Sequence, residues 1–344
     1  MDNNNSDYQD FKNLCYNLNA YEHLHIPSPS YQKRRAAVAA IIRCHPSSPP
    51  SIVRDQVTNL DEFFEQDWVK YGQAEILFMQ RASRESDRWS GHVSFVGGKN
   101  EPGETDEDTV KREVLEEIGI DLNQGYLKVG QLDEREITSV KDNKLLMMLS
   151  PFVYLQVVPE SPPFQLQTDE VAAVEWVPLS FFTSNQPYAN HAITEYLTLV
   201  QVKNRFVNRC IRFLMGSVTF PAVHLPTTAV NSRTTFKLWG LTLGMTSDII
   251  EFTKKNHLAF LKLTKSKPTY SRKDIGMLAA LITQLRYFIR YGKMELDLNS
   301  SAMRIKAKWD KVYWSSIRLA IIAAILLRLG FTSLFIRFLI NKVN

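Results

Sequence analysis

The chain has 344 residues, enough for one large domain or for one domain with sizeable extensions. With 44% hydrophobic and 22% charged residues it has the composition of a globular protein, and its net charge is +5. Lysine and arginine are dense after Lys254, but no arginine-rich block is interleaved with aromatic residues, which argues against nucleic-acid binding.

The cysteines and the two ends of the chain bear on its compartment. Cys15, Cys44 and Cys210 are odd in number and widely spaced, so they predict neither a disulfide framework nor a zinc site and favour a reducing compartment. The first residues, MDNNNSDYQDF, are unlike a signal peptide, and the final KVN is not a peroxisomal tripeptide. We therefore expect an intracellular protein.

Residues 1–34 are polar and contain two prolines, which predicts a mobile N-terminal arm with room for one short helix. Apolar runs then predict strands at Ala36–Cys44 and Glu75–Arg81, with a short helix between them at Leu60–Tyr71. A further short strand, Val93–Val96, leads into a pair of glycines.

A helix with distinct start and stop signals follows the glycines. Thr105 is a suitable N-cap, Asp108 completes a variant capping box, and the acidic first turn suits the helix dipole. Gly119 stands where the helix should end. The predicted core-facing stripe consists of Val110, Val114 and Ile118.

Three carboxylates share the neighbouring face of this helix. Glu113, Glu116 and Glu117 lie at i, i+3 and i+4, where they repel one another unless a cation lies among them. Hard oxygen ligands suit Mg²⁺ or Mn²⁺, which substrate phosphates usually complete. A solvated acidic face would have the same composition, but the preceding Gly97–Gly98 turn favours a metal site.

The order of strands, helix, strands and helix predicts an α+β fold in which helices sandwich a mixed β-sheet. We expect this domain to cover residues 35–265 and a C-terminal helical region to cover 266–344. The later elements expected are strands at Leu127–Ile137, Leu145–Val158 and Val171–Val177, a polar turn at Lys141–Lys144, and helices at Leu179–Phe182 and Phe236–Phe252.

The region 98–120 also matches every fixed position of a known motif, G-x5-E-x7-R-E-U-x-E-E-x-G-U with U apolar. Seven fixed residues at this spacing arise by chance at on the order of one in a hundred million starting positions. The sequence therefore resembles the Nudix hydrolase superfamily. The matching residues are Gly98, Glu104, Arg112, Glu113, Glu116, Glu117 and Gly119.

The resemblance implies hydrolysis of a phosphoanhydride with bound Mg²⁺ or Mn²⁺, which neutralises phosphate charge and lowers the pKa of a bound water. By position in the motif, Glu113, Glu116 and Glu117 would be metal ligands. The carbonyl of Gly98 would add a ligand, and Glu104 would act through a metal-bound water.

The resemblance leaves the catalytic base open, because it varies across the superfamily. Glu116 is the first candidate and Glu170 the second, although Glu170 is equally well explained as a surface strand residue. Arg112 is implied to orient the carboxylates as an ion-pair partner.

The flanking sequence resembles one subfamily, the coenzyme A diphosphatases. Residues 89–98, WSGHVSFVGG, are similar to the S-G-x-V-x-F-P-G-G run of that subfamily, and the resemblance extends over roughly residues 36–252. The chain departs from the pattern at Val96, where the subfamily has proline, and at Ser86–Trp89. The resemblance implies cleavage of coenzyme A or acyl-coenzyme A into 3',5'-ADP and a phosphopantetheine.

Four residues are candidates for binding a coenzyme A-like substrate. Arg81, Arg84 and Arg88 would pair with its phosphates, or would form a solvated loop. Trp239 would stack on adenine, or would pack in the core. Two other functions stay open: hydrolysis of another nucleoside diphosphate derivative such as ADP-ribose or NADH, and a membrane-tethered binding module without turnover.

The C-terminal region contains an amphipathic stretch, Ile275–Ile289, and the apolar segment Leu319–Ile340, which is long enough to span about 30 Å of hydrocarbon. Its Leu, Ile and Phe residues contribute roughly −4 to −8 kcal/mol to insertion. Arg328 at its centre costs about 2.5 to 3.5 kcal/mol. The segment therefore predicts a spanning anchor with the catalytic domain in the cytosol, a helix in the membrane interface, or a soluble helix packed on Ile275–Ile289.

Overall fold

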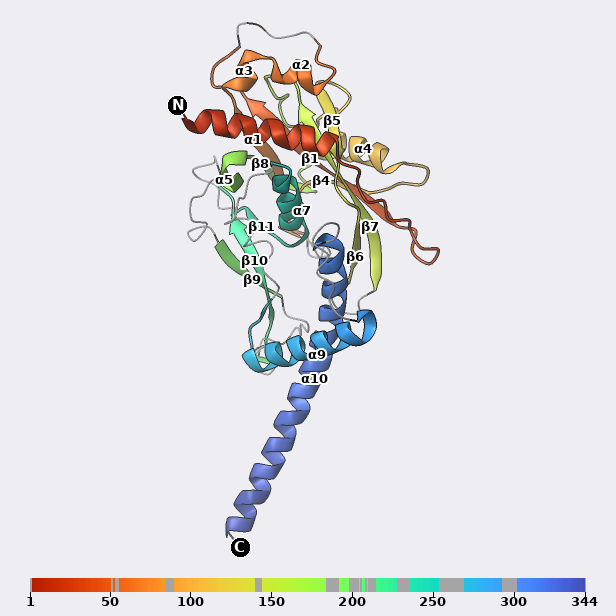
Figure 1. Ribbon diagram of the computed structural model, residues 1–344, viewed down its shortest axis with the longest axis vertical. Helices are drawn as coiled ribbons and strands as arrows, with labels where there is room; N and C mark the ends of the chain where they lie inside the picture. Colours follow the sequence, from red (N-terminus) through yellow and green to blue (C-terminus); the bar gives the residue numbers. More distant parts are fainter. Residues whose placement is uncertain are drawn as a thin grey trace. The chain divides into compact units, whose positions relative to one another are not determined.

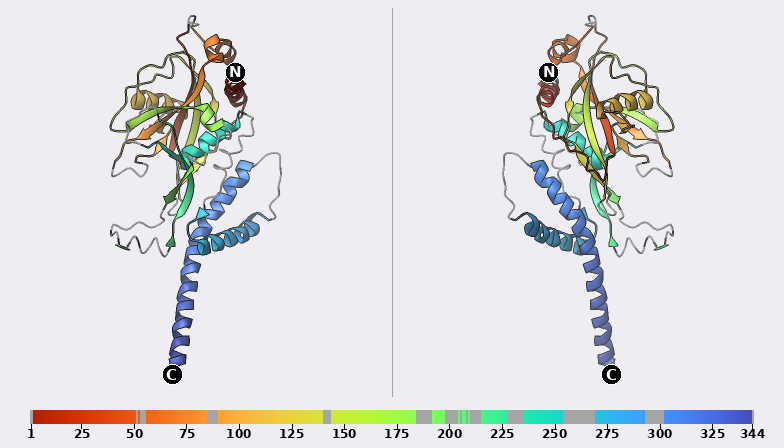
Figure 2. Two further views of the ribbon diagram at one scale, coloured as in Figure 1. Left: turned by 90° about the vertical axis from the view of Figure 1, so that its left-hand side faces the viewer. Right: turned by 90° about the vertical axis from the view of Figure 1, so that its right-hand side faces the viewer.

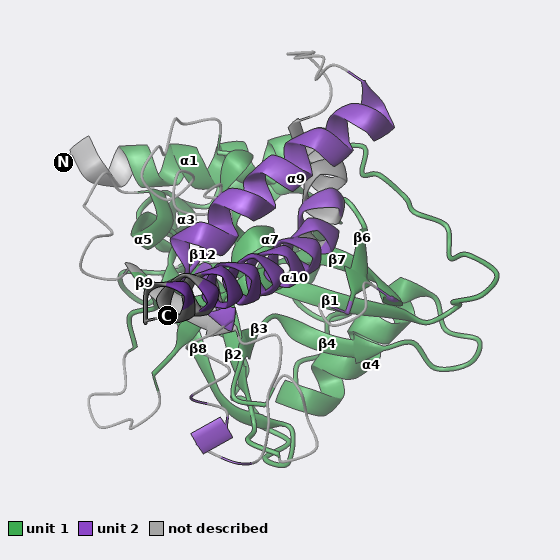
Figure 3. Ribbon diagram, turned by 90° about the horizontal axis from the view of Figure 1, so that it is seen from below, with its two compact units in different colours: residues 1–138, 145–194, 221–266 green, residues 139–144, 195–220, 267–344 purple. Residues whose placement is uncertain are grey.

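The computed structural model describes residues 2–50, 52, 56–84, 90–139, 144–183, 192–197, 204, 206–207, 209, 215–227, 235–253, 269–292 and 302–343. The chain divides into two compact units, coloured separately in Figure 3. The first unit comprises residues 1–138, 145–194 and 221–266, and the second comprises 139–144, 195–220 and 267–344.

An eight-stranded mixed sheet forms the centre of the first unit. Its middle strand is the apolar run after Arg35, which is buried on both faces, and it pairs with one neighbour in parallel and with two in antiparallel register. The sheet consists of β1 (Arg35–His45), β2 (Gln73–Arg81), β3 (Val93–Ser94), β4 (Val96–Lys99), β5 (Tyr126–Gln131), β6 (Arg135–Thr138), β7 (Leu145–Gln156) and β8 (Val171–Pro178).

Helices cover both faces of this sheet, so the predicted α+β sandwich is confirmed (Figure 1). Residues Val110, Val114 and Ile118 of one helix are buried on one face, as their spacing predicts. Within the part of this unit that the structure describes, the helices are α1 (Asp2–Asn19), α2 (Leu60–Phe64), α3 (Asp67–Lys70), α4 (Asp106–Ile118), α5 (Leu179–Thr183) and α7 (Gly240–Glu251).

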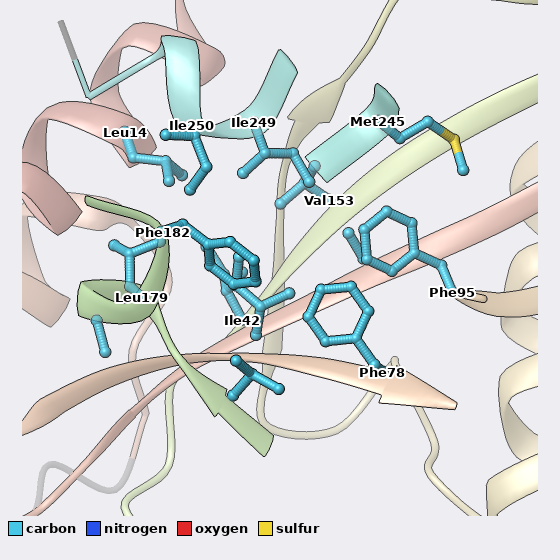
Figure 4. Packing of buried hydrophobic residues seen from close by; sticks show 14 of the residues in the cluster. Leu14, Ile42, Phe78, Phe95, Val153, Leu179, Phe182, Met245, Ile249 and Ile250 are labelled. Carbon is cyan, nitrogen blue, oxygen red and sulfur yellow. The ribbon is translucent and has the colours of Figure 1, made fainter. Parts of the chain in front are cut away.

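The prediction of a mobile arm is wrong for residues 2–19, which form α1 and belong to the first unit. Leu14 and Leu18 are fully buried, and Figure 4 shows Leu14 beside Ile249 and Ile250 of α7. The polar composition concealed this helix because its apolar residues occupy only one stripe. The large side chains Ile42 and Phe78 of the sheet belong to the same core cluster.

The prediction of a single helix over Phe236–Phe252 is also wrong for its first residues. Residues Lys237–Trp239 form a strand, β11, that pairs with β10 (Val218–His224), and α7 begins at Gly240. Gly240 has φ +63, a left-handed conformation that breaks a helix started any earlier. Trp239 is therefore a strand residue and the N-cap of α7.

The second unit contains the short strand β12 (Thr269–Tyr270), α9 (Lys273–Tyr291) and α10 (Ala302–Val343). Strand β12 pairs with Val218 and Thr219 of β10. A short strand, β9 (Ala192–Leu197), also pairs with β10. We expected each unit to be one continuous stretch of the chain, at 35–265 and 266–344. The structure instead builds each unit from several separate segments. Most of the predicted turn at Lys141–Lys144 and all of Cys210 lie outside the described residues.

Candidate active site

The carboxylate-bearing helix α4 begins and ends where the sequence predicts. Thr105 Oγ1 accepts a hydrogen bond from the Asp108 amide, and the Asp108 carboxylate accepts one from the Thr105 amide, each at 3.1 Å. Gly119 ends the helix in a left-handed conformation with φ 76. This capping fixes the register of the helix, and with it the direction of Glu113 and Glu117.

Glu117 is buried at the centre of the site. Its side chain accepts a hydrogen bond from the Gly97 amide at 3.1 Å, and the residue is only 2% exposed. Burial raises the pKa of Glu117 to about 7, the Gly97 amide acts against this rise, and the charges of Glu113 and Glu170 add to it. The site therefore disfavours the negative charge of Glu117 unless a cation compensates it.

The Gly97–Gly98 pair lies against buried Glu117 and half-buried Glu113. A Cβ at Gly98 would lie 2.3 Å from Glu113 Oε1, so the Glu113 carboxylate occupies space that only glycine leaves open. Gly97 has φ +144, and a Cβ there would lie 2.2 Å from the Ala37 carbonyl oxygen. Burial also raises the pKa of Glu113, against the opposing charge of Arg112.

Arg112 binds the remaining glutamates of the motif. It donates to Glu104 at 2.6 Å, and its Nη1 lies 3.0 Å from both Glu113 Oε1 and Glu116 Oε2. The hydrogen bond from Arg112 and one from the Glu101 amide lower the pKa of Glu104 to about 2. Arg112 is thus an ion-pair partner of Glu104, Glu113 and Glu116, and its orienting role stays a prediction.

Two of the predicted arginines and the second candidate base lie near these carboxylates. The positive charge of Arg81, at the end of β2, lowers the pKa of Glu117, while Glu170 raises it. Arg84 Nη1 lies 3.4 Å from Glu170 Oε1. The structure thus brings Glu113, Glu117, Glu170 and Arg81 into one electrostatic group, with Arg84 at its edge.

The other two substrate-binding candidates are placed differently. The Trp239 ring packs edge-on against His92, with ring centroids 4.9 Å apart. His92 immediately precedes β3, and its carbonyl accepts a hydrogen bond from the Arg81 amide at 3.0 Å. Arg88 lies outside the residues that the structure describes.

Sequence reasoning missed a buried polar network that supports the first turn of α4. Arg35 Nη2 lies 2.6 Å from Asp106 Oδ2 and 2.5 Å from Glu134 Oε1. Asn100, just after the glycine pair, donates to Asp106 at 2.6 Å. The signal for this network was weak, since only one arginine immediately preceding an apolar strand hinted at a buried partner.

Whether the site could hold a divalent cation depends on how its carboxylate oxygens are arranged. Among the residues that the structure describes, no three His, Cys, Asp or Glu side chains are arranged so as to enclose an ion. Burial nevertheless raises the pKa of both Glu113 and Glu117, so their surroundings disfavour the charged form of each carboxylate. Their oxygen donors suit Mg²⁺ or Mn²⁺, and Glu116 would join them on leaving Arg112.

Comparison with known proteins finds the family model of the NUDIX domain over residues 68–197. An uncharacterized protein of Schizosaccharomyces pombe is 31% identical over 217 residues, covering 61% of this chain and 65% of its own. The peroxisomal coenzyme A diphosphatase ndx-8 of Caenorhabditis elegans is 32% identical over 116 residues, covering 33% of this chain and 46% of its own. The chain thus spans less than two thirds of the length of each relative.

A solved structure of a MutT/nudix family protein from Enterococcus faecalis has 14% sequence identity and a TM-score of 0.33, and the alignment covers 88% of this chain and 83% of that one. The matched family region begins before β2 and includes the glycine pair, α4 and the strands that follow it. The chain therefore carries a NUDIX domain, as the motif at residues 98–120 predicts.

Proposed function

We propose that the NUDIX domain hydrolyses the diphosphate linkage of coenzyme A or acyl-coenzyme A, giving 3',5'-ADP and a phosphopantetheine. The observation that carries the proposal is the pair of carboxylates, half-buried Glu113 and buried Glu117, packed against Gly97–Gly98 beside the positive charge of Arg81. The coenzyme A diphosphatase ndx-8 supports the choice of substrate, as does the motif before the glycine pair.

In this proposal Glu113, Glu116 and Glu117 hold Mg²⁺ or Mn²⁺ with the Gly98 carbonyl, and Glu104 acts through a water. The bound metal supplies charge neutralisation and a water of lowered pKa. Arg112 holds Glu104, Glu113 and Glu116 in place before the metal binds.

Two glutamates remain candidates for the base that takes a proton from the attacking water. Glu116 is half exposed and paired with Arg112, and so must change partner to act. Glu170 lies within the same electrostatic group as Glu113 and Glu117, and its partner Arg84 can shift toward a substrate phosphate. The position of Glu170 favours a role in the site over that of a surface strand residue.

The substrate phosphates are proposed to bind Arg81, Arg84 and Arg88. An arginine presents two parallel donors that match a phosphate group. Trp239 is proposed to stack on the adenine, with His92 supporting its ring. No nucleic acid is expected as a partner.

We also infer that the C-terminal segment 319–340 attaches the protein to a membrane, with the NUDIX domain in the cytosol. Within α10, Ser315–Leu334 has a mean hydropathy of 1.9 and is 22% buried, whereas the core helix of a soluble protein is mostly buried. Lys306, Lys308 and Lys311 precede this stretch and favour a cytosolic N-terminal side.

A substrate panel tests the proposed reaction. The full chain in detergent with Mg²⁺ or Mn²⁺ is given coenzyme A, dephospho-coenzyme A, ADP-ribose, NADH and diadenosine polyphosphates, and the products are separated by chromatography. We expect coenzyme A to be cleaved with the highest kcat/KM, and dephospho-coenzyme A less well because it lacks the 3'-phosphate. Equal or faster cleavage of ADP-ribose would overturn the assignment of coenzyme A as the substrate. If no compound is cleaved, the result would favour a membrane-tethered binding module.

A further inference from the structure

The helix α9 is apolar on two opposite sides. One side packs against α10 and contains Ile275, Ala279 and Thr283, each of them fully buried. The opposite side, which α10 leaves uncovered, presents a stripe of five large apolar residues. These are Met277 (74% exposed), Leu281 (63%), Leu285 (59%), Phe288 (60%) and Ile289 (74%).

The contact between the two helices combines small residues with large apolar ones, among them Ile275, Ile317 and Ile321. Ser316, Ala320 and Ala324 are spaced four residues apart on α10 and are buried. Ala320 and Ala324 share a core cluster with Ala279 of α9. A soluble helix pair places its large apolar residues inside and its polar residues outside. This pair places large apolar residues on its outside as well as inside, and its contact includes small residues of the kind that bring helices together within membranes.

Several polar groups in these helices also find partners within the two helices. The hydroxyls of Thr283 and Ser316 donate to carbonyl oxygens one turn back in their own helices, at 2.6 and 2.8 Å. Thr332, which is exposed, does the same at 2.6 Å. Arg328, in the middle of the apolar segment, forms an ion pair with Asp274 at the start of α9. Each of these contacts lowers the free-energy cost of transferring the polar group from water into hydrocarbon.

The distribution of exposed residues indicates what covers them. A partner protein would cover one stripe of α10, but its exposed large residues extend well around the helix, and α10 runs on alone beyond α9 in both views of Figure 2. The acyl chains of a lipid bilayer, in contrast, can cover all sides of a helix at once. The exposed members on α10 are Leu319, Ile322, Leu326, Leu327, Leu329, Phe331 and Leu334.

We propose that α9 is a second membrane-inserted element, packed on α10, with its stripe of Met277, Leu281, Leu285, Phe288 and Ile289 in contact with lipid acyl chains. The inference rests on the proposed attachment through α10. The apolar part of α9, Ile275–Ile289, is about 22 Å long at 1.5 Å per residue, short of the roughly 30 Å hydrocarbon core. It therefore lies partly inserted beside α10 and does not cross the membrane.

Depth-dependent quenching in vesicles tests this placement. Full-length chains carrying Cys210→Ser and one added cysteine, either Leu281→Cys or Leu285→Cys, are labelled with a polarity-sensitive dye and mixed with phosphatidylcholine–phosphatidylserine vesicles. Cys15 and Cys44 are buried, and burial raises the pKa of both thiols, so neither reacts readily. Leu334→Cys reports on the anchor itself, and Tyr71→Cys, 68% exposed in the first unit, is the water-facing control.

We expect the protein to float with the vesicles, with spectra shifted to the blue and quenched by nitroxide lipids at positions 281, 285 and 334 but not at 71. Quenching at 334 without quenching at 281 and 285 would overturn the inference and leave the anchor intact. A protein that does not float would overturn both. Flotation with dyes at 281 and 285 shielded from nitroxide lipids, together with a dimer in detergent, would assign the stripe to a second chain and also overturn the inference.

Discussion

At the scale of single residues, the site depends on how Glu117 is buried. Among the described residues, the Gly97 amide donates a hydrogen bond to the Glu117 carboxylate. The neighbouring charges of Glu113 and Glu170 oppose ionisation of this carboxylate. An ordinary ion pair would have lowered the pKa of this group, as Arg112 does for Glu104. Glu104 and Glu117 thus differ in that Arg112 already neutralises Glu104, whereas burial disfavours the charge of Glu117.

The raised pKa of Glu117 predicts a pH-dependent stability for the metal-free protein. The folded-state value of about 7 exceeds the ordinary value of about 4.3, so stability falls as the pH rises between these values. Glu117→Gln removes this titration, and we expect its unfolding free energy to match wild type near pH 4 and to exceed it by up to about 3 kcal/mol at pH 8. Urea unfolding in EDTA measures both, and a difference independent of pH would contradict the assignment.

Gly98 provides a second prediction at this scale. Gly98→Ala places a methyl group where the end of the Glu113 side chain lies, so we expect turnover to fall while the fold persists, because a flexible side chain can move aside. Gly330→Ala is the matched control, since nothing lies within 4 Å of its added Cβ. Turnover and circular dichroism of both variants are compared. Unchanged turnover in Gly98→Ala would show that the contact with Glu113 is not needed.

At the scale of elements, α4 was predictable because every signal is local. Its N-cap, its C-terminal glycine and its apolar stripe all lie within fifteen residues, and the structure places each as expected. The helix α1 was not predictable in the same way, since its burial depends on α7, more than 200 residues away. The start of α7 was missed because the pairing of β11 with β10 is equally non-local.

The packing of α1 leads to a stability prediction. Leu14 is fully buried, so Leu14→Ala should lower the unfolding free energy by about 2 to 5 kcal/mol. Gln9→Ala, at an exposed position of the same helix, should change it by no more than about 0.5 kcal/mol. Thermal or urea unfolding of the two variants measures the difference. Equal stabilities would mean that α1 does not contribute to the core.

At the scale of the whole molecule, the chain contains two units that differ in what they expose. The sheet of the first unit is buried between helices, whereas α9 and α10 of the second leave many large apolar side chains uncovered. Sequence composition alone left a spanning anchor, a helix in the membrane interface and a soluble helix pair open for this region. The exposed apolar stripe of α9 supports the proposed membrane attachment, and it becomes visible only when the two helices are seen packed together.

The apolar C-terminal segment predicts how the protein partitions in cells. We expect the full chain to stay in the membrane pellet after alkaline carbonate extraction, and a chain stopped after Trp314 to be released, because the truncation removes the apolar stretch of α10. Immunoblotting of the two fractions measures this. A full chain that is soluble without detergent, and that behaves like the shortened one, would exclude membrane attachment.

The most direct test of the account is the rate of coenzyme A hydrolysis by the full chain and by its Glu117→Gln variant, each with and without Mn²⁺. We predict that wild type needs the metal and releases 3',5'-ADP with a phosphopantetheine, and that Glu117→Gln loses several orders of magnitude in rate while its circular dichroism is unchanged. Near-wild-type, metal-dependent turnover by Glu117→Gln would contradict the assignment of the glutamate pair as the metal site.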